Sequence, residues 1–339
     1  MDLIIKIVSL FLSVVFSLSS VFPSIASKNA EKFRLTAYFV GDNFSESDII
    51  DASHFEQLTD VILIGVTHFD TEGNINLSPN FELVLNSLRR AMQGSDARLH
   101  LNLLGPDSSQ QADTWEEQMN LRSIEHNKAF TSGRLEGNIK AVLDEYGFDG
   151  VFFDYEYPLT KEHYKVFDSF IISLDKVLGD DYVIGCAISG WNALQSKKAI
   201  RALDMVEVMA YDMWDADGTH SSVSSSKDCI YQMLKAGYPR EKLDLGIPFY
   251  ARPTNHDAYW YSYNGYADKL DENGLCYDEN TDLTFSFNTC DAVTEKTQWA
   301  IRCGLGGAMV WHYSCDVPAD NAKSLFNAMY EAKTGLIEK

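Results

Sequence analysis

Short apolar runs rich in β-branched residues alternate with amphipathic stretches along most of this sequence. The runs predict eight strands, at residues 35–40, 61–67, 99–104, 150–154, 182–187, 205–211, 243–248 and 307–312. The stretches between them predict helices, among them 133–146, 161–178, 224–236, 293–302 and 319–332. Near-continuous apolar strands covered by helices are typical of a parallel sheet, and eight such units favour a closed α/β barrel of the (β/α)8 TIM type.

A doubly wound open sheet is the alternative architecture. It normally carries a glycine-rich phosphate loop after its first strand, whereas Tyr38-Phe39-Val40-Gly41-Asp42 stands here. The longest connection, residues 251–292, lies between the seventh and eighth predicted strands and is rich in Tyr, Asn and Asp. We expect it to form a loop or small hairpin over the barrel mouth, not a second domain.

The first residues have the layout of a secretory signal peptide. One lysine precedes an apolar run, and small residues follow at Ser24-Ile25-Ala26. A membrane anchor is the competing interpretation, but serines and Pro23 interrupt the run. We therefore expect residues 1–26 to be removed and residues 27–339 to form one secreted domain.

The charge balance limits the partners. Forty-nine Asp and Glu against 28 Lys and Arg give a formal net charge of −21, which repels phosphate backbones and anionic lipid surfaces. We expect no nucleic-acid or membrane partner, and a monomer that binds a neutral or cationic ligand. The eight histidines show no metal-binding spacing, so neither a metal nor another cofactor is expected.

Six cysteines lie outside the signal segment, and an oxidising compartment permits disulfides. Cys276 and Cys290 flank a turn-rich stretch and could staple a hairpin. Cys186 and Cys303 stand in apolar runs and are interpreted as buried thiols.

Two carboxylates share one face of the fourth predicted strand. Side chains alternate across a strand, so Phe152, Asp154 and Glu156 point one way and Val151 and Phe153 the other. The apolar set suits the helix side of a barrel, which sends both acids inward at the carboxyl-terminal end, where active sites of this fold are built. Each acid should feel the charge of the other, so one can hold a proton near neutral pH and act as a general acid.

The segment YGFDGVFFDYEYP, residues 146–158, resembles the fourth-strand signature of family 18 glycoside hydrolases, the chitinases and their relatives. Further stretches agree with that family in order along the chain, namely Tyr38 in LTAYF, MAYD at 209–212, GIPFYAR at 246–252 and GGAMVW at 306–311. The resemblance covers about residues 33–335, and it rests on several motifs in register at different strand ends.

The resemblance implies a retaining, substrate-assisted hydrolysis of β-1,4-linked N-acetylglucosamine polymers such as chitin. Glu156 would be the acid/base, and Asp154 would orient the acetamido group and offset the charge of the oxazolinium intermediate. Tyr211 and Asp212 would hold the acetamido group in its attacking pose. The residues expected to contact the sugar are Trp311 as the floor, Tyr38, Met209, Trp214, Tyr250 and Arg252. Other aromatic residues near strand ends, including Trp191 and Trp260, could stack on further sugars.

The main departure of this sequence from the family pattern lies at residue 152. The family's second aspartate is replaced by Phe152, so Asp154 should lie against an aromatic ring and be harder to ionise. A chitinase-like lectin that binds amino sugars without cleaving them therefore stays open as an alternative. An endo-β-N-acetylglucosaminidase acting on N-glycans or peptidoglycan, which shares the acid and the acetamido chemistry, stays open as well.

Overall fold

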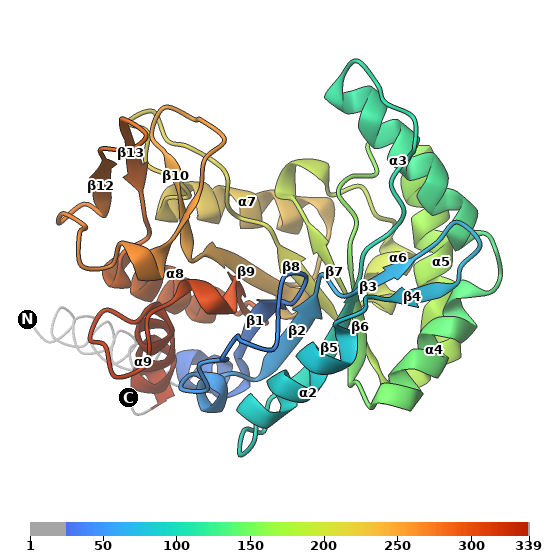
Figure 1. Cartoon of the computed structure of the whole chain (residues 1–339), viewed down its shortest axis with the longest axis horizontal. Coiled ribbons are helices and arrows are strands. Elements are labelled where there is room, and N and C mark those ends of the chain that lie inside the picture. Colours follow the sequence, from blue (N-terminus) through green and yellow to red (C-terminus); the bar gives the residue numbers. More distant parts are fainter. Residues whose placement is uncertain (1–24, 338–339) are drawn as a thin grey trace, which may run out of the picture.

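The computed structural model describes residues 25–337, and they form a closed barrel of parallel strands surrounded by helices (Figure 1). The barrel strands, in the order in which they neighbour one another, are β1 (Arg34–Val40), β2 (Asp60–Ile64), β5 (Arg98–Leu103), β6 (Gly150–Asp154), β7 (Val183–Ile188), β8 (Met205–Val208), β9 (Leu243–Pro248) and β14 (Gly307–Trp311). β14 pairs with β1 and closes the ring. All eight predicted strands are confirmed, although β2 and β8 each end three residues earlier than expected. The predicted signal peptide falls almost entirely outside the described residues.

Helices connect the strands and cover the outside of the barrel (Figure 1). They are α2 (Phe81–Ala91), α3 (Trp115–Phe130), α4 (Leu135–Tyr146), α5 (Lys161–Leu178), α6 (Lys197–Ala202), α7 (Val223–Ala236), α8 (Cys290–Cys303) and α9 (Leu325–Ile337). Hydroxyl side chains cap several helices at their start, as Thr160 does for α5 by accepting a bond from the His163 amide. Left-handed glycines such as Gly147 end others. Most of the predicted helices therefore begin and end within a few residues of the positions expected from the sequence.

The last helix begins later than predicted. Residue 319 was the expected start, but α9 begins at Leu325. The reason is the carboxylate of Asp316, which accepts hydrogen bonds from the backbone amides of Leu325 and Phe326 at 3.0 and 2.8 Å. Because the Asp316 side chain caps the helix at Leu325 and Phe326, the residues between 316 and 325 form a connecting loop and not the first turns of the helix.

Further strands lie outside the barrel. β3 (Thr67–Phe69) and β4 (Ile75–Leu77) form a two-stranded hairpin. The connection between β9 and β14 folds into a four-stranded sheet in the order β11 (Tyr261–Ser262), β10 (Tyr250–Pro253), β13 (Leu283–Ser286) and β12 (Leu275–Asp278). The expected loop or small hairpin therefore underestimates this segment. Phe285, which is fully buried, stacks against Tyr261 with ring centroids 4.4 Å apart and gives the small sheet its own apolar contacts.

Short 3₁₀ segments complete the described part of the chain. They are η1 (Phe55–Gln57), η2 (Gly179–Asp181), η3 (Gly190–Asn192), η4 (Arg240–Lys242), η5 (Tyr263–Gly265) and η6 (Tyr313–Cys315). Within these same residues, no helix has both the length and the apolar character needed to cross a lipid bilayer.

The inner and outer faces of the strands carry different apolar clusters, as the alternation predicts. Val151 and Phe153 pack with the helices in the large outer core. Phe152 belongs instead to a small cluster inside the barrel, with Tyr38, Ile62, Ile64, Met205 and Met309. The inward-facing acids that follow Phe152 in the sequence, Asp154 and Glu156, lie beyond this cluster at the carboxyl-terminal mouth.

The structure corrects the cysteine interpretation. All six cysteines are free thiols, so the possible staple between Cys276 and Cys290 is wrong. The thiol of Cys290 contacts the Lys323 carbonyl oxygen instead, at 3.4 Å. Cys186 is buried as expected, whereas Cys303 is only half-buried.

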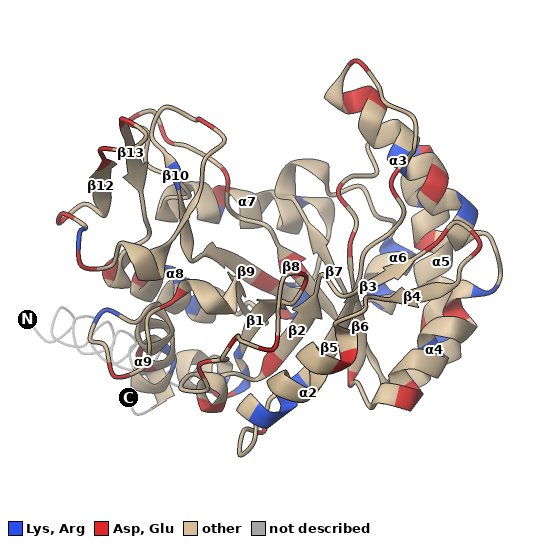
Figure 2. Cartoon of the chain, viewed as in Figure 1, with Lys and Arg blue, Asp and Glu red and all other residues tan. Residues whose placement is uncertain are grey.

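The charged residues are dispersed over the fold. Figure 2 shows Asp and Glu spread over helices and loops on both sides of the barrel, with Lys and Arg interspersed between them. The acidic residues are thus distributed over many elements and are not confined to one part of the ribbon.

Candidate active site

A cavity of about 540 Å³ opens at the carboxyl-terminal end of the barrel. Its lining includes the last residues of β6 and β14, Asp154 and Trp311. Nine of the ten residues predicted from the sequence line it: Tyr38, Asp154, Glu156, Met209, Tyr211, Asp212, Tyr250, Arg252 and Trp311. Residues far apart in the sequence therefore meet in one concave site, as expected for a barrel of this kind.

Trp214 is the predicted site residue that the structure does not bring into the cavity. Its indole Nε1 donates a hydrogen bond to the Pro253 carbonyl oxygen at 2.9 Å, and its ring stacks on His256 with centroids 4.7 Å apart. These contacts turn the indole away from the lining. Trp214 instead stabilises the loop that follows β8.

The carboxyl group of Asp154 is desolvated and incompletely bonded. Its Oδ1 atom is shielded from solvent and has no hydrogen-bond partner. Burial, reinforced by the negative charge of Glu156, raises the pKa of Asp154 well above its usual value. The two acids therefore favour a state in which one of them holds a proton, as the strand pattern predicts.

Phe152 lies directly below this pair, and the barrel has room for its ring because residue 185 is a glycine. A Cβ atom at Gly185 would stand only 2.1 Å from the Phe152 ring. The Phe152 ring also lies 5.1 Å from the His100 ring. An apolar ring therefore occupies the position two residues before Asp154 and offers that carboxyl group no hydrogen bond, which agrees with the raised pKa.

Glu156 is held through its backbone. Arg122 on α3 donates a hydrogen bond to the Glu156 carbonyl oxygen at 2.7 Å, and it also pairs with Asp107. This contact was not foreseen from the sequence, because α3 lacks a clear apolar stripe and was not predicted as a helix. The Glu156 side chain itself points to the cavity, where it can exchange a proton with a ligand.

Asp212 is clamped by three neighbours. Arg252 donates two hydrogen bonds to its carboxylate, at 2.9 and 2.8 Å, and the Tyr250 hydroxyl donates a third at 2.8 Å. The Nε2 atom of His220 lies 3.2 Å from the same carboxylate. Burial alone would raise the pKa of Asp212, but the bonds from His220, Arg252 and Tyr250 outweigh it and hold the pKa well below the usual range. Asp212 is therefore a fixed anion at the edge of the cavity.

Aromatic rings form the floor and one wall of the same space. Tyr38 and Trp311 lie with ring centroids 5.3 Å apart, and Tyr211 meets Tyr250 edge to face at 6.1 Å. Burial raises the pKa of both Tyr38 and Tyr211 well above 10, so their hydroxyls stay protonated and can donate hydrogen bonds. An apolar floor beneath polar donors suits the flat face and polar rim of a sugar ring.

A second aromatic group extends the cavity beyond the acids. Trp191 and Tyr157 line it, with ring centroids 5.1 Å apart, and Trp115 lies 6.3 Å from Trp191. Trp115 and Trp191 are more than half exposed. Trp191 was among the residues expected to stack on further sugars, and Trp260 also lines the cavity. Tyr157 and Trp115 were missed, although Tyr157 directly follows the acid Glu156 in the sequence.

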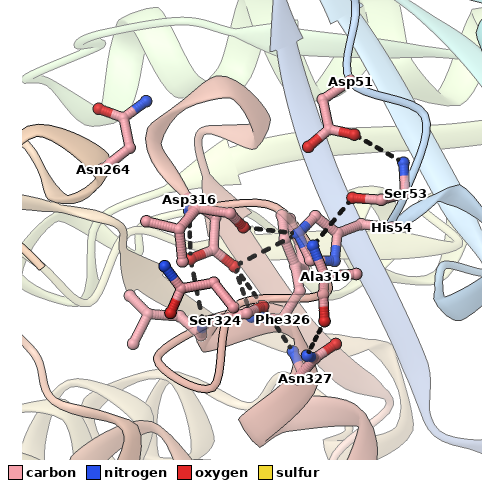
Figure 3. A network of polar contacts seen from close by, with 12 residues as sticks. Asp51, Ser53, His54, Asn264, Asp316, Ala319, Ser324, Phe326 and Asn327 are labelled. Carbon is pink, nitrogen blue, oxygen red and sulfur yellow. Dashed lines mark hydrogen bonds and ion pairs between the residues drawn. The ribbon is translucent and has the colours of Figure 1, made fainter.

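A second cavity of about 490 Å³ lies between the segment after β1 and the segment after β14. Beneath it, Asp316 binds the Ser324 hydroxyl at 3.0 Å as well as the first amides of α9, and His54 binds the Val317 carbonyl oxygen at 2.9 Å (Figure 3). These groups satisfy one another. The network therefore explains the packing of the final helix and does not add a reactive group.

The histidines near the mouth make hydrogen bonds with protein groups. His220 faces Asp212, and the Nε2 atom of His312 lies 3.3 Å from the Cys315 thiol. Burial lowers the pKa of His312 to about 4, so it is neutral at physiological pH. Within residues 25–337, no three His, Cys, Asp or Glu residues are grouped in a way that could hold a metal ion.

Sequence comparison places this site within a known family model. The model for Glycosyl hydrolases family 18 matches residues 115–316, well over half of the chain. Chitinase 1 of Aphanocladium album is 24% identical over 226 residues, covering 51% of this chain and 53% of the relative. Endochitinase 1 of Metarhizium robertsii is 22% identical over 242 residues, covering 56% and 57%. The chain thus spans about half the length of these curated relatives.

Solved structures show the same architecture over almost the whole chain. The GH18 chitinase ChiB of Flavobacterium johnsoniae superposes with a TM-score of 0.70 at 21% identity, covering 90% of this chain and 95% of that one. A class V chitinase variant of Nicotiana tobaccum in complex with NAG4 superposes with a TM-score of 0.68 at 17% identity, covering 89% and 99%. At these identities the likeness establishes the shared (β/α)8 fold.

Proposed function

This chain belongs to family 18 of the glycosyl hydrolases, and from that membership we propose that it cleaves β-1,4-linked N-acetylglucosamine polymers with Glu156 as the acid/base. The observation that carries the proposal is that Asp154, Glu156, Tyr211, Asp212 and Trp311 line one cavity. The chitinases among its relatives agree with this substrate class.

Glu156 protonates the departing glycosidic oxygen in the proposed reaction. The carbonyl oxygen of the substrate's own 2-acetamido group attacks the anomeric carbon, and the bond to the leaving sugar breaks. Glu156, now ionised, then takes a proton from the water that opens the oxazolinium intermediate, so the configuration is retained. The bond from Arg122 to the Glu156 backbone supports this role because it fixes the strand end that carries the acid.

Asp154 stabilises the positive charge that develops on the acetamido group. Its buried Oδ1 atom has no partner in the protein, so the acetamido N–H is a suitable donor for it. Once the acetamido N–H is bound, the proton shared by the two acids lies on Glu156 and Asp154 is ionised. The positive charge that then forms beside this carboxylate, in a desolvated site, is stabilised more strongly than in water.

Tyr211 and Asp212 hold the acetamido group in its attacking pose. The protonated Tyr211 hydroxyl is available as a donor, and the clamp of Arg252, Tyr250 and His220 keeps Asp212 in one place. Trp311 supports the face of the sugar ring. Fixing the acetamido group and the sugar ring before the reaction removes part of the entropic cost of the attack on the anomeric carbon.

The aromatic group of Trp115, Tyr157 and Trp191 extends the site for a polymeric substrate. Tyr157 adjoins the acid, while Trp311 supports the ring that reacts. We therefore assign this group to the leaving-group side of the scissile bond. Exposed tryptophans at such a position suit stacking against successive sugars.

Purified protein incubated with chitotetraose and chitohexaose tests the proposal. Mass spectrometry should show shorter oligosaccharides, and the anomer released first should be β, as retention requires. A Glu156→Gln variant should release sugar at a small fraction of the wild-type rate. Equal release by both proteins would remove the assignment. The same assay on N-glycopeptides and peptidoglycan fragments distinguishes a chitinase from an endo-β-N-acetylglucosaminidase.

One observation favours a second candidate function, an amino-sugar lectin. The Phe152 ring fills the position of the family's second aspartate and leaves the Oδ1 atom of Asp154 without a protein partner. If that change abolishes turnover, chitotetraose should bind in a calorimeter with no product after long incubation. Measurable turnover that depends on Glu156 would exclude this alternative.

We further propose that the protein acts outside the cell. The layout of its first 26 residues supports secretion, and one relative, from Penicillium expansum, is described as a secreted chitinase. Amino-terminal sequencing of protein recovered from culture medium should find a start near Ser27.

A further inference from the structure

Lys296 is a fully buried lysine on α8, on the outer side of the loop that carries Asp212. Its ammonium group donates hydrogen bonds to the Ser221 carbonyl oxygen and, at 2.7 Å, to the Asn288 side-chain oxygen. The mechanism proposed above does not use this residue. A buried cation with two fixed acceptors nonetheless requires a physical reason.

The loop that Lys296 contacts runs from Asp212 to Ser221 and folds back on itself. The Ser221 amide binds the Met213 carbonyl oxygen at 2.7 Å, and the Asp215 amide binds that of Thr219 at 3.0 Å. The two ends of the loop are therefore tied together. Since Ser221 is bonded to Met213, the neighbour of Asp212, a shift of Ser221 also shifts Asp212.

Both ends of this loop adopt left-handed backbone conformations. The φ angle is 56° at Asp212 and 49° at Ser221. Such conformations are uncommon for residues other than glycine and persist where surrounding contacts hold them. Arg252 and Tyr250 hold the Asp212 end, and Lys296 holds the Ser221 end.

His220 links the two ends. Its Nε2 atom lies 3.2 Å from both the carboxylate and the backbone amide of Asp212. It directly precedes Ser221, whose carbonyl oxygen accepts the bond from Lys296. We propose that Lys296 is a positioning residue for Asp212, acting through the anchored turn at Ser221 and through His220. This inference rests on the proposed function for its effect on catalysis, but not for its effect on the loop.

The energetic cost of the lysine supports positioning over simple core filling. Burial lowers the pKa of the Lys296 ammonium to about 7, opposed by the charge of Asp215. An apolar residue of similar size could fill the space without desolvating a cation. Only a donor at this place can bind the Ser221 carbonyl oxygen, which would otherwise be left unsatisfied inside the protein.

The test compares Lys296→Met with Lys227→Met as a matched control. Lys227, on the neighbouring helix α7, forms a solvent-accessible ion pair with Glu295. On chitotetraose, Lys296→Met should lower kcat about tenfold to a hundredfold with a smaller change in KM, since a misplaced orienting group weakens the transition state more than ground-state binding. The control should match the wild type in both constants.

A double-mutant cycle separates positioning from general destabilisation. In an Asp212→Ala background the orienting carboxylate is gone, so Lys296→Met should reduce kcat no further. Additive losses would overturn the proposal. Lys296→Gln, which keeps one donor without the charge, should restore part of the loss, and it replaces the methionine variant if that protein does not fold.

Hydrogen–deuterium exchange on the 212–221 peptide provides a readout that does not need turnover. The amides of Asp215 and Ser221 should exchange faster in Lys296→Met and unchanged in Lys227→Met. If the wild type proves inactive on all substrates, the proposed function fails while the exchange result still judges the anchor. Wild-type protection in Lys296→Met would overturn the inference regardless of activity.

Discussion

Buried carboxyl groups lie at both ends of the barrel, but the protein satisfies them in different ways. At the amino-terminal end, Asp60 pairs with Arg98 at 2.7 Å and with His100 at 2.8 Å, and Asp244 pairs with Arg34. At the carboxyl-terminal end, Asp154 has an oxygen with no protein partner and faces a cavity. The same residue type is neutralised internally at one end and left available to a ligand at the other.

Glu207 shows what happens when a buried acid has neither a hydrogen-bonded cation nor access to a cavity. Both of its carboxyl oxygens are buried without partners. Burial, with the charge of Asp244 adding to it, raises its pKa well above the usual value, so the group stays neutral. A raised pKa alone therefore does not identify a reactive acid, since Glu207 has one as well as Asp154. Access to the cavity makes the difference between the two.

The largest expected effect is a loss of activity on substitution of Glu156, at the open, carboxyl-terminal end of the barrel. Glu156→Gln removes the proton donor and should lower kcat on chitotetraose about a thousandfold, the middle of the range for general acid catalysis. Because the side chain faces the cavity and glutamine keeps its size, the free energy of unfolding should change by less than about 1 kcal/mol. Urea denaturation beside the kinetic assay checks both values. A large stability loss would show that the acid is structural.

The closed end should respond in the opposite way. Asp60→Ala leaves Arg98 and His100 without their carboxylate, and breaking a buried pair costs about 3 to 5 kcal/mol. The lower limit is expected here because the Arg98 side chain is 43% exposed and can be solvated. The kcat of the folded protein, measured well below its unfolding temperature, should stay within about twofold of the wild type, since the substitution lies outside the cavity. A large loss of kcat without a loss of stability would contradict the assignment of Asp60 to a purely structural role.

Only the open, carboxyl-terminal half of this contrast can be predicted from the sequence. Period-two alternation places Phe152, Asp154 and Glu156 on one face, and eight apolar runs place that face inside a barrel. The strand ends then bring Tyr211 and Trp311 to the same cavity. These features follow from local periodicity and from the rule that active sites form at the carboxyl-terminal end of such barrels.

Other parts depend on contacts that no local pattern reveals. Gly185 makes room for the Phe152 ring from a neighbouring strand, and Arg122 reaches Glu156 from a helix without a clear apolar stripe. Trp214 follows a site motif but turns toward Pro253. Each of these outcomes is decided by tertiary packing, since the residues involved are distant in the sequence or compete for one of several partners.

A smaller effect concerns how far the open end extends beyond its acids. Trp191→Ala removes the centre of the Trp115, Tyr157 and Trp191 group and should cost about 1 kcal/mol of stacking, roughly fivefold in kcat/KM on chitohexaose. A 4-nitrophenyl chitobioside, which has no sugar on the leaving-group side, should be cleaved at the wild-type rate. Tyr231→Ala, at an exposed aromatic of α7, serves as the control. Equal losses on both substrates would place Trp191 on the other side of the scissile bond.

The smallest effect tests why the two ends differ in protonation. The reactive state needs one proton shared between Asp154 and Glu156, so the acid limb of kcat/KM reports the loss of the first proton from the pair. Burial beside the Phe152 ring holds that proton to higher pH. Phe152→Asn introduces a neutral amide donor that stabilises ionised Asp154, so its pKa should fall and the acid limb should move to lower pH. Phe152→Leu, which adds no donor, should leave the limb in place. If the leucine variant shifts the acid limb equally, loss of the ring and not the gained hydrogen bond controls the ionisation of Asp154. The pKa of Asp154 would then be set by its solvation alone, and not by the lack of a hydrogen-bond donor.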